Sequence, residues 1–580
     1  MYLRTTQRRN ADGSTVRYYQ LAENTWDAAK GCAVARVVHN FGRADQLDRE
    51  KLQRLAQSIL RVVRQDGDQL VSDDGTEIQL LQAWPYGGLW VLEQLWKELG
   101  LDSILKQHAG GKRATARLID AIFVMVANRT LEPVSKLYCW EQWLREQVFL
   151  PRGNALELHH LYLGMDLLES HKEQIEKSVY FTTADLMNAD VDLIFYDTTS
   201  LHFEVDEEDE ADLGKRGHSY PAQRKRGHSK NGRDDAPQIV VGLAVTRDGL
   251  PVRSWVFPGN TADVTTVERV KNDLRGWRLG RCVFVGDAGM NSEENRRQLS
   301  LGAGKYILAA KMRAGDEVTH EVLTRPGRYK AMRDNLRVKE VVVGEGERSR
   351  RYVVCHNPLE EQRQRTHRER LLSELELELG SLRQLEGARH SKRACELRTS
   401  GRFGRYLRED DAGKLSVDAA KVRDAERYDG KWVVTSNDDT LTSEDLALGY
   451  KQLMRVEQCW RQLKSGLRLR PVYHYRPWRI HAHVTITVLG LLLERIIEIR
   501  AGDTWRNVLD KLQTIKVVEY ERNGVRVRQT TELRDDVKRL LERLNVAPPP
   551  KLHEVQSQSD SQRAATMAPP PPPPAVAESA

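Results

Sequence analysis

Apolar positions are spaced differently in successive parts of this chain, and each spacing predicts a different kind of structure. Residues 2–43 contain extended runs, with a hairpin signal at Asp12-Gly13. From Leu47 to about Leu186, apolar residues recur at steps of three and four, which is the period of an amphipathic helix. We therefore expect a small β unit over residues 1–45 and a helical domain over residues 46–188.

The spacing becomes strand-like from Val191 onward. The expected elements, in order, are strands Val191–Asp197, Gln238–Thr246 and Val252–Pro258, a helix from Thr265 to about Arg275, a strand from Cys282 to Asp287, a helix from Asn291 to about Leu299 and a strand Lys305–Ala310. Three meander strands followed by alternating helix and strand is the element order of a ribonuclease H-like fold. We expect an α/β domain of this kind, whose first part covers residues 189–312.

The next part of the chain interrupts that domain. Residues 313–440 contain strand-like runs at Val338–Val343, Tyr352–Cys355 and Lys431–Thr435, and one charged helical stretch from about Leu359 to Gln384. We interpret this part as a mainly β insertion domain with one helical excursion. Residues 441–546 should then supply the second part of the α/β domain and C-terminal helices.

Two segments near the C-terminus differ from the rest in composition. Val484 to Leu493 is the strongest apolar stretch, but it is about half as long as a segment that spans a bilayer, so we expect a buried helix. The tail over residues 547–580, with its proline run at Pro569–Pro574, cannot bury a core and is expected to be disordered. Since the start has no apolar signal segment, we expect a cytoplasmic protein that is neither exported nor membrane-bound.

The six cysteines are scattered and form no C-x-x-C pair, which argues against a zinc ribbon or a disulfide framework and fits a reducing cytosol. Charge adds a weak indication of a polyanionic partner, because the net charge is +7 but 90 basic residues are offset by 83 acidic ones. Residues 204–233 carry an acidic block followed by a basic block from Lys215 to Arg233. This segment is either a flexible basic loop that grips DNA or a solvated surface loop.

Three carboxylates carry the candidate chemistry. Asp197 and Asp287 each end an apolar run, where an open α/β sheet places its functional site, and Glu457 lies on a later predicted helix. Alone, Asp197 is better explained as a turn or N-cap residue, and Asp287 could be a turn residue before Gly289. Together, in this order of elements, the three predict a site that holds two divalent cations about 3.5–4 Å apart on a scissile phosphate.

The helix that carries Glu457 provides a second argument. Steps of three and four align five residues on one face, namely Tyr450, Leu453, Glu457, Trp460 and Lys464. A carboxylate that faces a core is costly without a cation, which favours metal binding over a surface salt bridge with Arg461 or Lys464. On this interpretation Arg461 and Lys464 contact DNA phosphates. Trp460 is either a core residue or a base-stacking surface, and the core is favoured.

Three histidines follow this helix, His474, His481 and His483. Positions 481 and 483 face different sides of a predicted helix. We therefore expect capping and polar contacts from these side chains and no metal ligation.

Four stretches of the sequence carry a family resemblance. They are Tyr196-Asp197-Thr198-Thr199, Gly259-Asn260-Thr261, Gly286-Asp287-Ala288-Gly289-Met290 and the run from Tyr450 to His483 with Leu467-x-x-Arg470-Pro471-Val472-x-His474. From residue 2 to about residue 500 the chain resembles a bacterial insertion-sequence transposase of the DDE class. It is most similar to the cut-and-paste branch with a β-strand insertion and a Tyr-x2-Arg-x3-Glu-x6-Lys signature. The signature arginine falls on Leu453 here, so either this subgroup replaces a phosphate contact or this copy is weakened.

The resemblance implies an enzyme that binds the terminal inverted repeats of its own element in double-stranded DNA, cuts the ends and joins them to a target. It implies Asp197, Asp287 and Glu457 as catalytic metal ligands, with two Mg²⁺ ions per site and Mn²⁺ as a substitute. Tyr450, Arg461 and Lys464 are the implied DNA contacts. The resemblance further implies a homodimer in the paired-end complex, DNA binding by the helical domain and a location at the bacterial nucleoid. Two alternatives stay open: an inactive DNA-binding regulatory relic, and a simple metal-dependent nuclease without strand transfer.

Overall fold

The computed structural model covers most of the chain, which divides into two compact units. The residues described are 2–9, 15–27, 32–43, 70–71, 77–109, 113–187, 192–210, 212–213, 219–230, 232–277, 279, 282–313, 317–346 and 349–557. The larger unit comprises Ala83–Val517 and Thr530–Lys551, and the smaller unit comprises Met1–Gln82, Val518–Gln529 and Leu552–Ala580.

The smaller unit is built from β-strands. β1 (Tyr2–Arg9), β2 (Thr15–Asp27) and β3 (Cys32–Arg43) form an antiparallel three-stranded sheet, which confirms the β structure expected there. The expected hairpin turn at Asp12-Gly13 lies outside the described residues. A second sheet has the order β21-β20-β19-β5-β4, with the bounds Leu552–Ser557, Val525–Thr530, Lys516–Arg522, Glu77–Pro85 and Leu70–Val71.

β21 corrects the expectation that the chain is disordered from Ala547 onward. Leu552–Ser557 pairs with β20 in an antiparallel ladder that runs from Val525↔Ser557 to Gln529↔Leu552. Arg528 adds an ion pair with Glu554 at 2.6 Å. A strand at the edge of a sheet is held mainly by backbone hydrogen bonds to its neighbour and needs few apolar side chains of its own. Composition alone therefore failed to predict β21. Residues 558–580, with the proline run, lie outside the described part.

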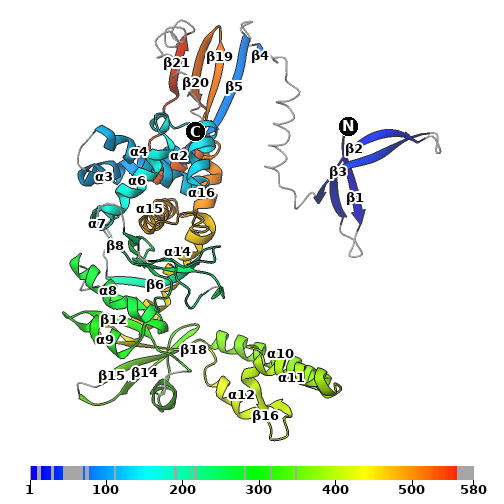
Figure 1. The fold of residues 1–580 in the computed structure, drawn as a ribbon, viewed down its shortest axis with the longest axis vertical. Helices are drawn as coiled ribbons and strands as arrows, with labels where there is room; N and C mark the ends of the chain where they lie inside the picture. Colours follow the sequence, from blue (N-terminus) through cyan, green and yellow to red (C-terminus); the bar gives the residue numbers. More distant parts are fainter. Residues whose placement is uncertain are drawn as a thin grey trace, which may run out of the picture. The chain divides into compact units, whose positions relative to one another are not determined.

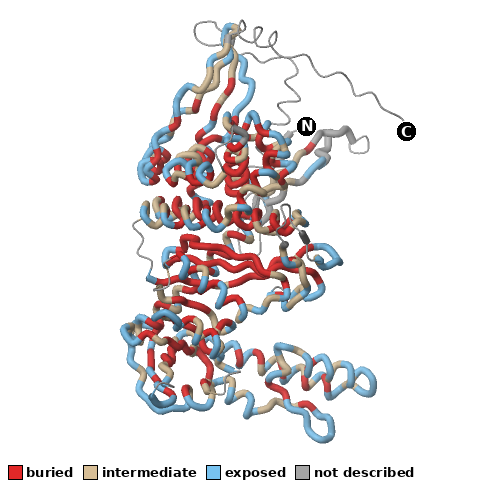
Figure 2. The backbone as a smooth tube through the Cα atoms, turned by 60° about the vertical axis from the view of Figure 1, so that its left-hand side comes forward, coloured by how far each residue is buried: buried red, intermediate tan, exposed pale blue. Residues whose placement is uncertain are grey.

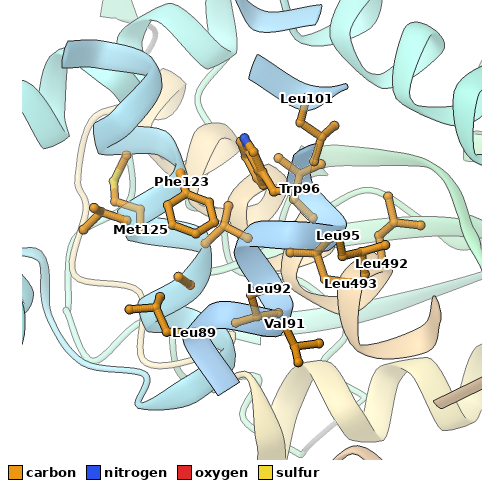
Figure 3. Packing of buried hydrophobic residues seen from close by; sticks show 14 of the residues in the cluster. Leu89, Val91, Leu92, Leu95, Trp96, Leu101, Phe123, Met125, Leu492 and Leu493 are labelled. Atoms are coloured by element: carbon orange, nitrogen blue, oxygen red, sulfur yellow. The ribbon is translucent and has the colours of Figure 1, made fainter. Parts of the chain in front are cut away.

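One group of helices in the larger unit surrounds an apolar core. These are α2 (Gly87–Glu98), α3 (Leu101–Ala109), α4 (Arg113–Leu131), α5 (Lys136–Tyr138), η1 (Cys139–Gln147), η2 (Pro151–Gly153), α6 (Leu158–Ser170), α7 (Lys172–Leu186), α15 (Pro477–Ala501), α16 (Trp505–Leu512) and α17 (Asp535–Leu544). Trp96 and Phe123 pack here together with Leu492 and Leu493 of α15 (Figure 3). The helices expected before residue 188 are therefore confirmed from residue 87 onward, whereas β4 and β5 precede them.

α15 runs through this core. Among the described helices it is the one long and apolar enough to cross a membrane, yet 89% of its apolar window is buried inside the protein. Buried residues are concentrated in the helices around this core and in the sheet beside it (Figure 2). The buried helix expected at Val484–Leu493 is confirmed.

A nine-stranded sheet is the other main element of the larger unit, in the order β10-β9-β6-β11-β12-β18-β15-β14-β13. Strands β6, β12, β18, β15 and β14 of this sheet are labelled in Figure 1. Its strands are β6 (Leu193–His202), β9 (Gln238–Val245), β10 (Pro251–Pro258), β11 (Val283–Gly286), β12 (Lys305–Ala309), β13 (Lys330–Arg333), β14 (Leu336–Val343), β15 (Arg350–His356) and β18 (Lys431–Ser436). β9 is antiparallel to β6 and β10, and β11 is parallel to β6 and β12. Each strand expected between Val191 and Ala310 is present.

Helices cover both faces of this sheet. They are α8 (Asp263–Gly276), η3 (Ala288–Met290), α9 (Glu293–Ser300), α13 (Ser443–Lys451), α14 (Met454–Arg461) and η7 (Gln462–Gly466). Tyr196 belongs to a core with Val267 of α8, whereas its neighbour Phe195 belongs to a core with Trp460 of α14. The alternation of side chains along β6 thus separates two apolar cores.

The segment between β12 and β18 differs from the mainly β insertion expected there. β13, β14 and β15 extend the main sheet and do not form a sheet of their own. The rest contains η4 (Glu317–Val322), α10 (Pro358–Leu382), α11 (Gly387–Thr399), η6 (Gly404–Tyr406), β16 (Leu407–Glu409), β17 (Leu415–Val417) and α12 (Ala419–Glu426). Leu375, Leu379 and Leu397 form a separate core there. The alternation of apolar residues predicted these strands, but it could not predict that they pair with the main sheet.

Candidate active site

Asp197 lies in the middle of a strand. β6 continues from Leu193 to His202, with Asp197 opposite Leu243 of β9. The expectation that Asp197 ends its strand is therefore wrong. Thr198 and Thr199 continue the pairing with β9, because β-branched residues favour the extended backbone. Asp197 is consequently neither a turn residue nor an N-cap.

Asp287 comes directly after the strand next to the one that carries Asp197. β11 runs parallel to β6 with Val285 opposite Phe195, and each aspartate follows two residues later. Asp287 directly follows β11, as predicted, and its Oδ1 accepts a hydrogen bond from the Met290 backbone N–H at 3.2 Å. Burial raises the pKa of Asp197 to about 6, and the negative charge of Asp287 adds to this rise while Lys230 opposes it.

Glu457 belongs to a shorter helix than expected. α13 ends at Lys451 and α14 begins at Met454, so Tyr450 and Glu457 do not share one continuous helix. Glu457 is exposed, and the buried face of α14 consists of Val456, Cys459 and Trp460. The predicted stripe is wrong because the chain turns between the two helices. α14 packs against β6 and β9, which brings it to the strand that carries Asp197.

Tyr450 is close enough to each of the three carboxylates for their charges to act on its phenol. The pKa of its phenol is raised to about 12, first by burial and then by the negative charges of Asp287, Glu457 and Asp197. The hydroxyl is therefore neutral and can donate a hydrogen bond. The three carboxylates predicted from the sequence share one electrostatic neighbourhood.

Lys230 and Asp263 join this group, although the sequence did not identify them. Lys230 Nζ lies 2.9 Å from the Asp263 carboxyl and 3.7 Å from that of Asp197. It also donates to the backbone oxygen and the hydroxyl of Thr198, both at 2.8 Å. Lys230 was visible only as part of the basic block, and Asp263 only as an acidic residue soon after Gly259-Asn260-Thr261.

Close backbone packing holds the Lys230 loop against the sheet. Lys225 and Gln238 exchange two backbone hydrogen bonds of 3.0 Å. A Cβ atom on Gly259 would lie 2.0 Å from the Gln238 carbonyl oxygen, so only glycine fits there. The acidic and basic halves of the segment neutralise each other through Asp209 with Arg224 and Glu208 with Lys225. Lys230 is the basic residue of this loop that reaches Asp197.

Lys464 and Arg461 lie in different surroundings. The pKa of Lys464 is lowered by burial and by the positive charge of Arg470, while the negative charge of Asp197 acts against this. The charge of Asp197 therefore acts on Lys464. Arg461 is exposed and lines a surface groove with Arg495 and Glu498.

Two of the three histidines make the expected polar contacts, whereas the start of α15 has no side-chain cap hydrogen bond of the kind expected. His481 Nδ1 lies 2.8 Å from the Glu169 carboxylate, and His483 Nε2 lies 3.0 Å from the Leu469 carbonyl oxygen. Both rings sit on α15 and are oriented by these contacts.

The donor atoms at the carboxylate group fit a hard divalent cation. Carboxylate and hydroxyl oxygens are the ligands that Mg²⁺ prefers, and the Lys230 ammonium between Asp197 and Asp263 shows that this place attracts positive charge. Across the described residues, no three potential ligands stand close enough to form a ready-made metal cluster. A metal would therefore require side chains here to move, above all Lys230.

Two protein-family profiles match different parts of this chain. A profile described as "Transposase DDE domain" matches residues 202–493, about half of the chain, and one described as "IS1634 family transposase, N-terminal domain" matches residues 3–70. No curated protein matches the sequence. A solved structure described as a cryo-EM structure of piggyBac transposase synaptic complex with hairpin DNA is 9% identical, with 86% of this chain and 90% of that chain covered at a TM-score of 0.33.

Proposed function

This chain belongs to the DDE transposases of insertion sequences, and we propose that it binds the terminal inverted repeats of its own element, cuts the DNA there and joins the ends to a target. Members of this family are metal-dependent enzymes that cleave DNA and transfer strands. The observation that carries the proposal is the parallel register of β6 and β11, in which Val285 pairs with Phe195 and each aspartate follows two residues later. Glu457 of α14 shares their electrostatic neighbourhood through Tyr450.

We propose that the catalytic domain is ribonuclease H-like. The order β10-β9-β6-β11-β12 supports this, with β9 antiparallel to β6 and β11 parallel to it. Three meander strands, followed by two that add in parallel beside the first, is the arrangement expected of that fold. The segment from β13 to β18 then separates these strands from α14 in the sequence.

Asp197, Asp287 and Glu457 are the proposed metal ligands, for two Mg²⁺ ions that Mn²⁺ can replace. Such ions, when bound, activate the attacking oxygen and neutralise charge on the phosphate. The raised pKa of Asp197 supports this role, because burial makes its charge costly and a cation would offset that cost. Lys230 provides part of this positive charge in the free protein.

Lys464 and Tyr450 are the proposed DNA contacts nearest to these ligands, and Arg461 is proposed to contact a different stretch of DNA. Leu453, at the place of the signature arginine, is 7% exposed and belongs to the same core as Phe195. An arginine there would have to leave that core to reach a phosphate. Lys464 and Lys230 therefore supply the positive charge that the signature arginine would bring.

We further propose that the protein acts as a homodimer on two paired DNA ends, at the nucleoid in the bacterial cytoplasm. The helical part before β6 is the proposed reader of the repeat.

The test is an assay of the purified full chain on a duplex that carries the DNA bordering its gene. With Mg²⁺, we expect nicks at the repeat boundary and joining of the 3′ ends to a target plasmid. Nicking without joining would favour the simple nuclease, and binding without nicking would favour the inactive relic.

A further inference from the structure

A second group of basic side chains is buried away from the carboxylates, within the larger unit. Arg129 near the end of α4 and Lys136 at the start of α5 are each 6% exposed. Arg129 Nη1 donates to the Arg468 carbonyl oxygen at 3.1 Å. The rings of His474 and His483, 5.7 Å apart, complete the group. It joins the helices to the segment that follows Lys464.

Within the described residues, neither Arg129 nor Lys136 has a carboxylate partner. Burial, and then the charge of Arg129, lowers the pKa of Lys136 to about 7. In the described part of the chain, no carboxylate is among the charges that shift the pKa of Arg129, Lys136 or His474. The nearby Cys139 thiol is neutral, because burial raises its pKa to about 12. A buried cation without a counter-charge is costly, and an anion from outside the chain would offset that cost.

The group also has unused hydrogen-bonding capacity. Arg129 Nε and His483 Nδ1 are buried and have no hydrogen-bond partner within the described residues. Buried polar atoms are normally paired, and an unpaired one in a native protein requires an explanation. Arg129 is the more informative of the two, since a guanidinium can only donate.

Exposed aromatic side chains border the group. Tyr473 and Tyr475 are 72% and 64% exposed, and they flank His474 in the sequence. Tyr473 is close enough for its phenol to influence the pKa of Arg129. Exposed aromatic rings next to basic side chains are typical of surfaces that contact nucleic acid.

Only a few residues of sequence separate Lys464, on which the charge of Asp197 acts, from Arg468, which binds Arg129. The pKa of Lys464 responds to both Asp197 and Arg470, and Arg470 lies two residues after Arg468, whose carbonyl oxygen binds Arg129. A single strand of DNA with one phosphate near Lys464 could therefore present another phosphate to Arg129 and Lys136.

We propose that Arg129, Lys136 and His474 form a binding site for one backbone phosphate of the DNA strand that also contacts Lys464. The phosphate brings the missing negative charge and accepts hydrogen bonds that the fold leaves unused. This inference rests on the proposed function, because the phosphate is taken to belong to the end of the element.

Lys136→Met tests the site, because it removes the charge while keeping a long apolar side chain in the same space. The affinity of the full chain for a duplex with the terminal repeat is measured over a range of salt concentrations. We expect affinity to fall on the order of tenfold at low salt and the slope of log affinity against log salt to fall by about one. The unfolding temperature of the free protein should stay the same or rise. Lys97→Met is the matched control, because Lys97 is exposed and paired with Glu93.

Duplexes with a single neutral methylphosphonate linkage provide a second readout. The wild-type protein should lose affinity at one linkage position, and Lys136→Met should be insensitive there. Should Lys136→Met lower the unfolding temperature, Arg129→Gln replaces it in the same assay. Equal affinity, slope and linkage sensitivity in wild type and variant would overturn the proposal.

Inorganic phosphate distinguishes the two sources of this ligand. If it stabilises the wild type but not Lys136→Met, while DNA binding is the same for both, the site takes free phosphate and the DNA proposal is overturned. A wild-type protein that fails to bind any terminal repeat would instead contradict the proposed function. A wild type that binds and cleaves, with a variant indistinguishable from it, contradicts this inference alone.

Discussion

At the scale of single residues, burial makes the charged form of the Asp197 carboxylate costly. Its pKa is raised to about 6 from an ordinary value of about 4, so the folded protein binds this proton more tightly than the unfolded chain does. The free energy of unfolding therefore falls as the pH rises from about 4 through 6, and this effect is complete above that range. A cation that binds the carboxylate restores the lost stability.

Asp197→Asn should separate stability from chemistry. At pH 8 without metal, we expect the variant to unfold at the same temperature as wild type or about 2 °C higher. Mg²⁺ or Mn²⁺ should stabilise wild type but not the variant. Calorimetry at pH 8 and pH 5 checks this, since the difference should shrink at pH 5, where the wild-type carboxyl is mostly protonated. A large fall in the unfolding temperature at pH 8 would mean that Asp197 serves the fold through Lys230.

Lys464→Ala and Arg461→Ala should differ in their effect on DNA binding. The charge of Asp197 acts on Lys464, whereas Arg461 lines a different groove. For cleaved ends, we expect the slope of log affinity against log salt to fall by about one in Lys464→Ala. Arg461→Ala should change it less. Equal slopes for wild type and Lys464→Ala would remove the lysine from the phosphate contacts.

At the scale of elements, the sequence predicted the strands well, but it predicted the helix boundaries and the tertiary contacts around the strands less well. The strand that ends in Asp287 and the helix at Val484–Leu493 were visible because period and apolar length are local properties. The break between α13 and α14 was not, because the apolar steps continue across it. Lys230 and Asp263 were missed because only tertiary packing brings the loop and α8 to β6.

Gly259→Ala should release the loop that carries Lys230. A Cβ atom there would lie 2.0 Å from the Gln238 carbonyl oxygen and 2.1 Å from that of Lys225. We expect faster amide hydrogen exchange over residues 223–238 and a fall in cleavage of at least about tenfold. Gly276→Ala is the control, because nothing lies within 4 Å of its added Cβ. Unchanged exchange in Gly259→Ala would mean that the loop tolerates the displacement.

Two truncations should distinguish β21 from the tail beyond it. A chain that ends at Ser557 keeps β21, and we expect its thermal unfolding to match that of the full chain. A chain that ends at Lys551 loses the ladder with β20 and the Arg528–Glu554 ion pair. Hydrogen exchange in β20 should then rise. The same exchange in both truncations would contradict a structural role for β21.

At the scale of the whole molecule, the carboxylate group is assembled from distant parts of one chain. β6 brings Asp197, β11 leads into Asp287, and α14 returns after the helical segment with Glu457. Neighbouring parallel strands supply the first two positions, whereas the third depends on how α14 packs on β6 and β9. Activity therefore requires the whole domain to be folded.

The most direct test of the central claim is a nicking assay on a duplex with the terminal repeat, run beside a gel-shift assay on the same preparations. The account predicts that wild type nicks with Mg²⁺ or Mn²⁺, binds without nicking in Ca²⁺, and is inactive in excess chelator. Asp197→Asn, Asp287→Asn and Glu457→Gln should each bind the repeat and fail to nick it. Nicking in chelator, or by any of the three variants at the wild-type rate, would contradict the account.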